Sequence, residues 1–339
     1  MPNELAAVPP TASAVARTGT AVDAPVDVSV LVPAKDEAEN LPLFMREAAA
    51  TFAARSERYE VVVVDDGSVD DTWRVLGELA EQYPFLRRVR HRTRRGIADA
   101  LRTGYLNARG PVLVFYPADM QFKPEDIPRL VAPILANESD MVTGFKQGNY
   151  EKAFVSRIYN GLSRSLFDIP VRDLNNVKAY RREIMDGLPV RPDWHRYMIV
   201  IAAAQGYTVS EIPVPLYPRH AGKSKFGLSR IPVGVLDMLS VWFELKFGRK
   251  PLLLFGMLGA GLFMLGFLVG LVAVVRLLMY NVGERWLWML VQTFVLMGSV
   301  LFVGGFLGEM IAVQREELRE LRRRVEDARD GAGAGRAAS

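Results

Sequence analysis

Two long segments with almost no charge lie near the C-terminus of the chain. Residues 251–275 contain no charged side chain, and residues 286–313 contain only Glu309. Each segment exceeds the ~20 residues that an α-helix needs to cross the ~30 Å hydrocarbon core of a bilayer. A helix of this length in a soluble core would carry a polar stripe, which neither segment has. The pattern therefore predicts a transmembrane helical hairpin over residues 250–313.

Basic residues gather at the two free ends of this hairpin. Arg249 and Lys250 precede the first helix, and Arg315 and residues 322–324 follow the second. Because the cytosolic flanks of membrane helices are enriched in Lys and Arg, both ends are expected to face the cytosol. Residues 314–339 would then form a charged cytosolic tail.

The rest of the chain divides by composition. Residues 1–24 are rich in Ala, Thr, Val and Pro and lack the pattern of a secretory signal, so a disordered tail is expected. Residues 229–249 are very apolar but interrupted by Asp237 and Glu244, which fits an amphipathic helix in the membrane interface. Residues 25–228 have the composition of a soluble domain.

This soluble domain alternates strand and helix patterns. Apolar, β-branched runs predict strands at 26–34, 59–66, 85–90 and 111–119. Amphipathic segments predict helices at 38–54, 71–83 and 97–108. Further helices are expected at 125–136, 151–167 and 196–205, and further strands at 140–144 and 207–217. The alternation predicts an α/β domain with a mostly parallel, doubly wound sheet.

Polar clusters follow three of the predicted strands. Lys35, Asp36 and Glu37 follow the first, the sequence DDGS at 65–68 ends the second, and ADMQ at 118–121 ends the fourth. Ligands of doubly wound sheets bind beyond the carboxyl ends of the strands, so the clusters predict one shared site. Adjacent carboxylates repel each other unless a ligand or cation shares them, which favours a ligand over a simple helix cap.

The content of metal-binding and basic residues narrows the chemistry. The chain has no cysteine and three scattered histidines, so a metal would need carboxylate and amide oxygens, which suit Mg²⁺ or Mn²⁺. The densest basic run, residues 87–95, lacks interleaved aromatic residues, and the chain carries membrane segments. We therefore expect no nucleic-acid partner; a solvated face or an anionic partner remains open for this run.

Three motifs together resemble a known family. VPAKDEAENL at 32–41, VVVVDDGSVDDT at 61–72 and the ADMQ cluster have the order and spacing of family 2 glycosyltransferases with the GT-A fold. The resemblance covers about residues 26–230 and looks closest to the polyprenyl-phosphate sugar transferases of the dolichol-phosphate mannose synthase type. In the bacterial branch of that type it extends to the membrane hairpin.

The resemblance implies a function and a location. It implies transfer of a sugar from a UDP- or GDP-sugar to a polyprenyl phosphate by a single inverting displacement. It also implies an integral protein of the cell inner membrane, with its catalytic domain and both termini in the cytosol. Membrane lipids would be partners, and the GxxxG spacings at Gly266/Gly270 and Gly304/Gly308 permit a homo-oligomer.

The resemblance also assigns site residues. The expected donor-binding residues are Pro33, Ala34, Asp36, Glu37, Asp65, Asp66, Arg95, Gly96, Arg219 and Lys225. The expected catalytic residues are Asp119, Arg157, Asp173 and Lys223. Arg219, Lys223 and Lys225 lie in a basic loop that would bind phosphates. His195 falls near the implied reaction centre, but a lone histidine is more often structural.

The implied metal motif departs from its family pattern. The family has DxDxQ, whereas this chain has Pro117, Asp119 and Gln121. Asp119 and Gln121 remain as metal ligands for Mg²⁺ or Mn²⁺, and water and donor oxygens would have to supply the rest.

Three other interpretations differ in acceptor or activity. A glycosyltransferase acting on the hydroxyl group of another membrane lipid would need a true general base, for which Asp173 is the candidate. A non-catalytic membrane scaffold with a degenerate transferase domain is supported only by Pro117. A polysaccharide synthase would carry a Q-x-x-R-W motif and more membrane helices, and the chain has neither.

Overall fold

The computed structural model of the chain describes residues 25–147, 161, 166–167, 174, 176–188, 194–218, 231–248, 250–281 and 283–337. It divides into two compact units, Met1–Ile231 and Pro232–Ser339, which we call the N-terminal and C-terminal units. The expected disordered tail at 1–24 and most of the expected helix at 151–167 lie outside the described residues.

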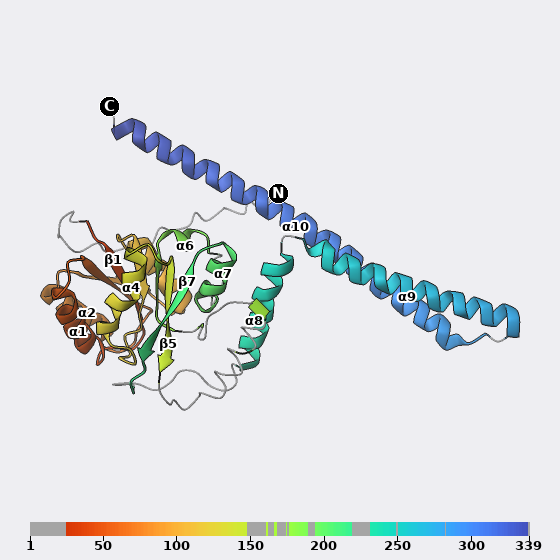
Figure 1. The fold of residues 1–339 in the computed structure, drawn as a ribbon, viewed down its shortest axis with the longest axis horizontal. Helices are drawn as coiled ribbons and strands as arrows, with labels where there is room; N and C mark the ends of the chain where they lie inside the picture. The colour runs from red at the N-terminus through yellow and green to blue at the C-terminus, as the bar shows by residue number, and fades with distance from the viewer. Residues whose placement is uncertain are drawn as a thin grey trace, which may run out of the picture. The chain divides into compact units, whose positions relative to one another are not determined.

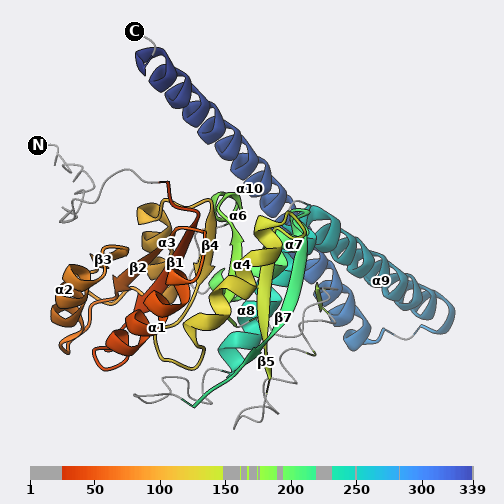
Figure 2. The same ribbon diagram turned by 60° about the vertical axis from the view of Figure 1, so that its left-hand side comes forward.

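A seven-stranded sheet forms the centre of the N-terminal unit (Figures 1 and 2). Its strand order is β3-β2-β1-β4-β6-β5-β7. The first four strands are β1 (Val28–Ala34), β2 (Tyr59–Asp65), β3 (Leu86–Arg90) and β4 (Val112–Phe115). They pair in parallel, β2 with β3, β1 with β2 and β1 with β4. Their buried apolar residues explain the continuous apolar runs in the sequence.

The other strands are β5 (Met141–Gln147), β6 (Lys178–Arg181) and β7 (Val209–Pro215). β6 lies between β4 and β5 and is antiparallel to both, whereas β5 and β7 are parallel. The sequence did not predict β6. Its four residues, KAYR, are too short for an alternating pattern and have a cation at each end.

Helices cover both faces of this sheet and bury two apolar clusters. One cluster packs α1 (Leu41–Ala53), α2 (Thr72–Gln82) and α4 (Ile127–Leu135) against the sheet. The other packs α3 (Ile97–Asn107), α6 (Glu183–Asp186) and α7 (Met198–Ala204). Two short 3₁₀ helices are η1 (Pro124–Asp126) and η2 (Trp194–Arg196). The predicted doubly wound α/β architecture is confirmed.

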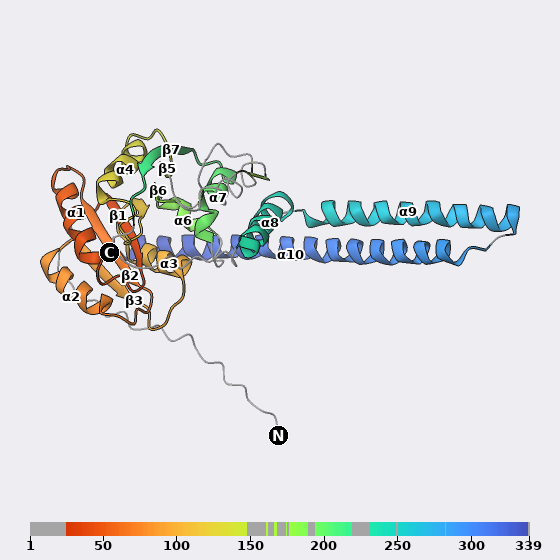
Figure 3. The same ribbon diagram turned by 90° about the horizontal axis from the view of Figure 1, so that it is seen from below.

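The C-terminal unit contains α8 (Ile231–Phe247), α9 (Pro251–Tyr280) and α10 (Arg285–Ala337). Two stretches, Pro251–Tyr280 and Arg285–Leu318, are long and apolar enough to cross a membrane, with mean hydropathies of 2.5 and 2.0. α9 and α10 run side by side in opposite directions (Figures 1 and 3). Only 11% of each apolar window is buried, unlike a soluble core helix, so the apolar surface is available to lipid.

Glycines allow the two long helices to approach closely. A Cβ atom on Gly298 would lie 2.9 Å from the carbonyl oxygen of Gly259, and one on Gly259 would lie 2.8 Å from that of Gly298. Of the predicted GxxxG positions, Gly266 lies against Phe294, whereas a Cβ on Gly304 would meet nothing within 4 Å. Part of the glycine pattern therefore serves packing inside the hairpin.

Polar groups in the hairpin have partners. The carboxylate of Glu309, the one acid in the second apolar segment, accepts a hydrogen bond of 3.2 Å from the backbone N–H of Leu252 at the start of α9. This satisfies a donor that the helix itself leaves without a partner. At the opposite end, Arg276 and Glu284 form an ion pair of 2.7 Å.

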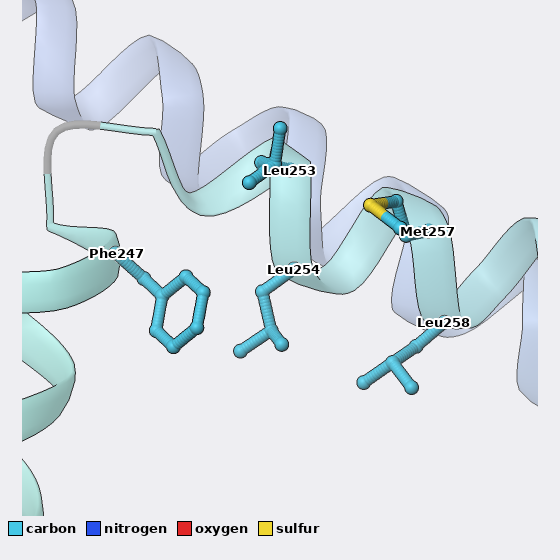
Figure 4. A pocket seen from close by; sticks show the side chains of 5 residues that line it. All are labelled: Phe247, Leu253, Leu254, Met257 and Leu258. Carbon is cyan, nitrogen blue, oxygen red and sulfur yellow. The ribbon is translucent and has the colours of Figure 1, made fainter.

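An apolar crevice lies within the C-terminal unit where α8 ends and α9 begins (Figure 4). Its volume is about 370 Å³. The lining side chains are Phe247, Leu253, Leu254, Met257 and Leu258. All of these described side chains are apolar, so the surface that they form is suited to hydrocarbon.

Candidate active site

The candidate site lies at the carboxyl edge of the sheet. β1, β2, β3 and β4 are parallel, so the loops that follow them emerge at the same edge. The strand order reverses between β1 and β4, since β2 lies on one side of β1 and β4 on the other. Such a switch point opens a crevice in doubly wound sheets. The three polar clusters of the sequence follow β1, β2 and β4 and therefore meet here.

Several hydrogen bonds join the loops after β1 and β2. The backbone N–H of Asp36 donates to Oγ of Ser68 over 2.9 Å, and the N–H of Val69 donates to Oδ1 of Asp36 over 3.0 Å. Nζ of Lys35 donates to the carbonyl oxygen of Gly67 over 2.8 Å. The predicted donor-binding Asp36 therefore helps to hold the two loops in one conformation.

Glu37 also contacts the protein. Its carboxylate accepts a hydrogen bond of 2.6 Å from Nδ2 of Asn40, and its N–H donates to Oγ1 of Thr72 over 2.9 Å. Pro33 and Ala34 end β1, where the carbonyl oxygen of Ala34 accepts from the N–H of Asp66 over 2.8 Å. All four predicted donor-binding residues of this loop thus lie at the carboxyl edge.

Asp65 is fully buried, with 0% of its surface exposed. Oδ1 accepts a hydrogen bond of 2.8 Å from the N–H of Ser68, and Oδ2 lies 3.1 Å from Nε of Arg90. The guanidinium of Arg90 in turn lies 5.4 Å from the centre of the Trp73 ring. Because burial of a charge is costly without a partner, Arg90 explains how this carboxylate is retained inside the domain.

Asp66 accepts three hydrogen bonds from the loop before α3. The donors are Nδ1 of His91 at 2.9 Å, the N–H of Arg95 at 2.7 Å and the N–H of Gly96 at 2.8 Å. Burial alone would raise the pKa of this carboxyl, but the bonds from His91, Arg95 and Gly96 outweigh burial and lower the pKa below 3.8. Asp66 is therefore ionised at neutral pH and fixes the start of α3, including the predicted site residues Arg95 and Gly96.

Gly67 occupies a position that only glycine suits. Its φ of +67° is unfavourable for other residues, and a Cβ atom would lie 2.8 Å from the backbone N of Arg94. The glycine of the DDGS motif therefore lets the loops after β2 and β3 approach each other.

The implied metal ligands are partly exposed in the segment after β4. Burial alternates from Tyr116 to Phe122, with the even-numbered residues buried and the odd-numbered residues partly exposed. Pro117, Asp119 and Gln121 are therefore partly accessible to solvent. The N–H of Gln121 donates to Oδ1 of Asp119 over 3.2 Å.

The donor set of this segment fits a hard cation with few protein ligands. One carboxylate and one amide side chain supply oxygen, as Mg²⁺ and Mn²⁺ prefer. Among the described residues, no group of three or more His, Cys, Asp and Glu side chains could hold a metal. The arrangement therefore fits a cation that keeps water and takes further oxygens from its substrate.

Lys178 is a buried cation that the sequence analysis did not select. It is the first residue of β6 and pairs with Phe115, the last residue of β4. Its exposed fraction is 1%, and Nζ donates to the carbonyl oxygens of Leu174 and His195 over 3.2 and 3.0 Å. The DLNNVK sequence at 173–178 contained the signal, a lysine within an otherwise apolar run, but its burial depends on β6.

His195 is buried beside this lysine, with 3% of its surface exposed. Burial, together with the positive charges of Lys178 and Arg196, lowers the pKa of its imidazole from 6.5 to about 3. The ring lies edge-on to Phe115, with centroids 6.4 Å apart. His195 is therefore neutral at physiological pH.

Several predicted residues cannot be placed at this edge. Arg157, Asp173, Arg219, Lys223 and Lys225 lie outside the described residues. Within the basic run, Arg87, Arg88 and Arg90 contact Glu60, Trp73 and Asp65, respectively, whereas Arg92 and Arg94 are exposed. Half of the run is therefore structural. The nucleotide contacts predicted for the described residues stay predictions.

Comparison with protein families and with curated sequences gives matches along most of the chain. The family model described as Glycosyl transferase family 2 matches residues 29–186. Dodecaprenyl-phosphate galacturonate synthase of Rhizobium johnstonii is 28% identical over 85% of this chain and 88% of its own length. Undecaprenyl-phosphate 4-deoxy-4-formamido-L-arabinose transferase of Klebsiella pneumoniae subsp. pneumoniae is 30% identical over 84% of this chain and 88% of its own length.

Solved structures give the same fold at lower identity. Glucosyl-3-phosphoglycerate synthase from Mycobacterium tuberculosis, in complex with Mn²⁺, UDP and glucosyl-3-phosphoglycerate, is 20% identical with a TM-score of 0.51. The match covers 64% of this chain and 80% of that chain. The complex of the same enzyme with Mg²⁺ and UDP gives a TM-score of 0.52 over 64% and 79% of the two chains. This likeness supports the GT-A-like fold of the N-terminal unit.

Proposed function

The chain belongs to glycosyl transferase family 2 and is a glycosyltransferase, and on this premise we propose that it transfers a sugar from a UDP- or GDP-sugar to a polyprenyl phosphate. The observation that carries the proposal is the extent of the match to transferases whose names specify undecaprenyl or dodecaprenyl phosphate. The N-terminal unit makes up about two thirds of the chain, whereas the two matches cover 85% and 84% of the whole chain. They therefore extend into the apolar helices.

The proposed donor subsite is the carboxyl edge of β1, β2 and β3. Base and ribose would lie against Pro33, Ala34, Asp36 and Glu37, with Arg95 and Gly96 on the other side. Asp65 and Asp66 would act mainly by holding these loops, since both carboxylates are bound by protein groups. Pre-formed loops reduce the entropy that a nucleotide must lose on binding.

Asp119 and Gln121 are the residues that would hold Mg²⁺ or Mn²⁺. A bound cation would offset the negative charge that develops on the leaving nucleoside diphosphate. The basic residues Arg219, Lys223 and Lys225 would bind phosphate oxygens and share this task. Pro117 leaves the site one carboxylate short of the family pattern.

An acceptor phosphate needs placement more than activation. An isoprenoid phosphate is already ionised near neutral pH, so its oxygen can attack the anomeric carbon without loss of a proton to a base. The bond between that carbon and the diphosphate breaks as the new bond forms, which inverts the anomeric centre. Asp173 and Arg157 would orient the reactants.

The proposed location follows from the acceptor and the helices. A polyprenyl phosphate keeps its hydrocarbon in the bilayer, so the transferase must work at a membrane surface. Basic residues at both ends of the helix pair favour a cytosolic N-terminal unit and cytosolic termini in the inner membrane. Lipids would surround α9 and α10.

The test is transfer of label into lipid. Detergent-solubilised full-length protein is incubated with undecaprenyl phosphate, Mg²⁺ or Mn²⁺, and a panel of radiolabelled UDP- and GDP-sugars, and label in the organic phase is counted. Transfer from one donor, abolished by Asp119→Asn, is the expected result. Binding of nucleotide without transfer from any donor would contradict the proposal. In a parallel assay with diacylglycerol in place of undecaprenyl phosphate, transfer of label would identify a hydroxyl acceptor.

A further inference from the structure

Lys178 lies where three segments of the N-terminal unit meet. The antiparallel direction of β6 puts Lys178 beside Phe115 at the end of β4, four residues before Asp119. Its ammonium group donates to Leu174, which follows Asp173 in the sequence, and to His195 in the turn η2. One side chain therefore contacts the end of β4, Leu174 and the turn η2.

The contact with β4 involves side chains as well as the backbone. Nζ of Lys178 lies 5.9 Å from the centre of the Phe115 ring, within the range of a cation–π interaction. His195 packs on the same ring, edge-on. Thr143 of β5 pairs with Lys178 from the other side. Lys178 therefore has a neighbouring strand on each side, β4 on one and β5 on the other.

A buried cation at this position has a cost that the fold must offset. Removing an ammonium group from water is unfavourable unless hydrogen bonds replace its hydration. Two of the replacements are backbone carbonyls of different segments, so these carbonyls are held in place by the need to satisfy the charge. An apolar residue would pack in the same space without imposing this geometry.

Two buried polar groups near Lys178 lack hydrogen-bond partners among the described residues. Asn176 and His195 are both buried, and Nδ2 of Asn176 and Nδ1 of His195 have no hydrogen-bond partner among the described residues. A buried polar group without a partner is unfavourable, so each one calls for a physical explanation. Both lie on segments that Lys178 contacts or belongs to.

From these contacts we propose that Lys178 is a positioning residue. Its ammonium group holds Leu174 and the 194–196 turn against the end of β4, and thereby aligns the acceptor side of the proposed site with Asp119, the proposed metal ligand. Lys178 acts through these segments and touches no reacting atom. The expected effect of Lys178 on turnover rests on the proposed glycosyl transfer. Its expected effect on the order of the backbone does not.

The test compares two variants on the same strand. Lys178→Met keeps the length and packing of the side chain and removes the charge and the hydrogen bonds. Arg181→Met is the matched control, because it removes a cation from the opposite end of β6, where Arg181 pairs with Asp140 at 3.0 Å. Both are made in the full-length protein. Amide hydrogen exchange, UDP affinity and the kinetics with undecaprenyl phosphate are measured.

In Lys178→Met we expect exchange at residues 174–177 and 194–197 to rise at least ~10-fold, with exchange in α1 to α3 within ~2-fold of wild type. We expect kcat/KM for undecaprenyl phosphate to fall at least ~30-fold while the Kd for UDP changes less than ~3-fold. Lys178→Arg, which keeps the charge and donors, should restore most of the exchange protection. Arg181→Met should lower stability without this kinetic split.

Equal exchange and equal acceptor kinetics in Lys178→Met and Arg181→Met would overturn the proposal. If Lys178→Met does not fold, Lys178→Arg decides. Near wild-type protection of the 174–177 and 194–197 segments would support the inferred contacts, because the charge and the donors are retained, and loss of protection in these segments would overturn them. Absence of lipid-linked product in wild type would refute the proposed function alone, because the exchange data still test Lys178.

Discussion

Nδ1 of His91 lies 2.9 Å from Oδ1 of Asp66, and Nε2 of the same ring lies 2.8 Å from Oγ1 of Thr103. A carboxylate can only accept, so Nδ1 carries the proton, and in the neutral ring Nε2 accepts from the threonine hydroxyl. The imidazole therefore connects the end of β2 to α3. Together with the N–H groups of Arg95 and Gly96, it makes Asp66 the anchor of the loop that borders the proposed nucleotide site.

Removing the charge of Asp66 should destabilise the N-terminal unit. In Asp66→Asn an amide replaces the acceptor, so at least one buried donor loses its partner, at a cost of about 1–3 kcal/mol. The midpoint of thermal unfolding should fall by roughly 3–10 °C, and UDP affinity should fall with it.

Asp71→Asn is the control for Asp66→Asn, because the Asp71 carboxylate is 71% exposed and pairs with Arg74 at the surface. Surface pairs contribute little, so this variant should stay within about 0.5 kcal/mol of wild type. Equal melting temperatures for the two variants would argue against the anchoring role of Asp66.

Alanine at Gly67 should be more harmful than alanine at Gly206. Both glycines have positive φ, +67° and +93°, so both variants strain the backbone, by about 1–2 kcal/mol. At Gly67 the added Cβ also meets the backbone of Arg94 at 2.8 Å, whereas at Gly206 it meets nothing within 4 Å. Thermal unfolding and UDP titration measure the difference. Equal effects on both would mean that the close approach of the two loops is unimportant.

Restoring a carboxylate at position 117 should strengthen metal binding. Pro117, Asp119 and Gln121 are all partly exposed in one short segment, so Pro117→Asp is expected to add a third oxygen ligand near the other two. We expect the Mn²⁺ concentration for half-maximal transfer to fall by roughly 10-fold, or about 1.4 kcal/mol.

Asp119→Asn in the Pro117→Asp background provides the control for this metal effect, since it should raise the Mn²⁺ requirement again. If neither substitution changes the Mn²⁺ concentration for half-maximal transfer, the metal binds at other residues.

The stability of the protein should fall on acidification because of His195. The folded protein holds the imidazole neutral down to a pKa of about 3, whereas the unfolded chain protonates it near 6.5. Between these values the unfolded state binds one more proton, so stability decreases by up to about 1.4 kcal/mol per pH unit as pH falls, and is fully present above 6.5.

His195→Gln removes this titration and should flatten the dependence of the melting temperature on pH between 6.5 and 5. An unchanged slope in the variant would show that His195 is accessible to protons in the folded state.

Leucine at Gly298 should disrupt the helix pair, and leucine at Gly304 should not. A side chain at Gly298 would collide with the backbone of Gly259, since even its Cβ would lie 2.9 Å from the carbonyl oxygen. Overpacking of this kind costs about 1–3 kcal/mol. The Cβ of Gly304→Leu meets nothing within 4 Å. Thermal unfolding in detergent compares the two. Equal loss of stability would imply that Gly304 lies in a contact with a second molecule.

The sequence was sufficient where a pattern is local. β1, β2 and β4 were predicted because buried strands of a parallel sheet are continuous apolar runs, and α1, α2 and α3 because their buried residues recur at helical spacing. The two apolar helices were predicted from length and charge alone. β6 was not, because four residues with a cation at each end carry no periodic signal.

The position of the candidate site could be predicted from the sequence, but the contacts between its residues could not. Three polar clusters at strand ends were enough to locate it, since parallel strands end at one edge. That Asp66 binds His91, Arg95 and Gly96 could not be read from the sequence, because the partners lie 25 to 30 residues away and meet only when β2 and β3 pair.

The sequence by itself determined the α/β class, the membrane helix pair and the strand ends at which charged side chains gather, because each depends on spacing along the chain. Only the tertiary structure decided what those side chains do. In the folded protein, Asp65 is buried against Arg90, and Asp66 accepts hydrogen bonds from the loop before α3. Lys178 lies between β4 and β5 and donates to two backbone carbonyls. Burial and pairing arise from contacts between distant segments, and one residue's place in the sequence does not specify them.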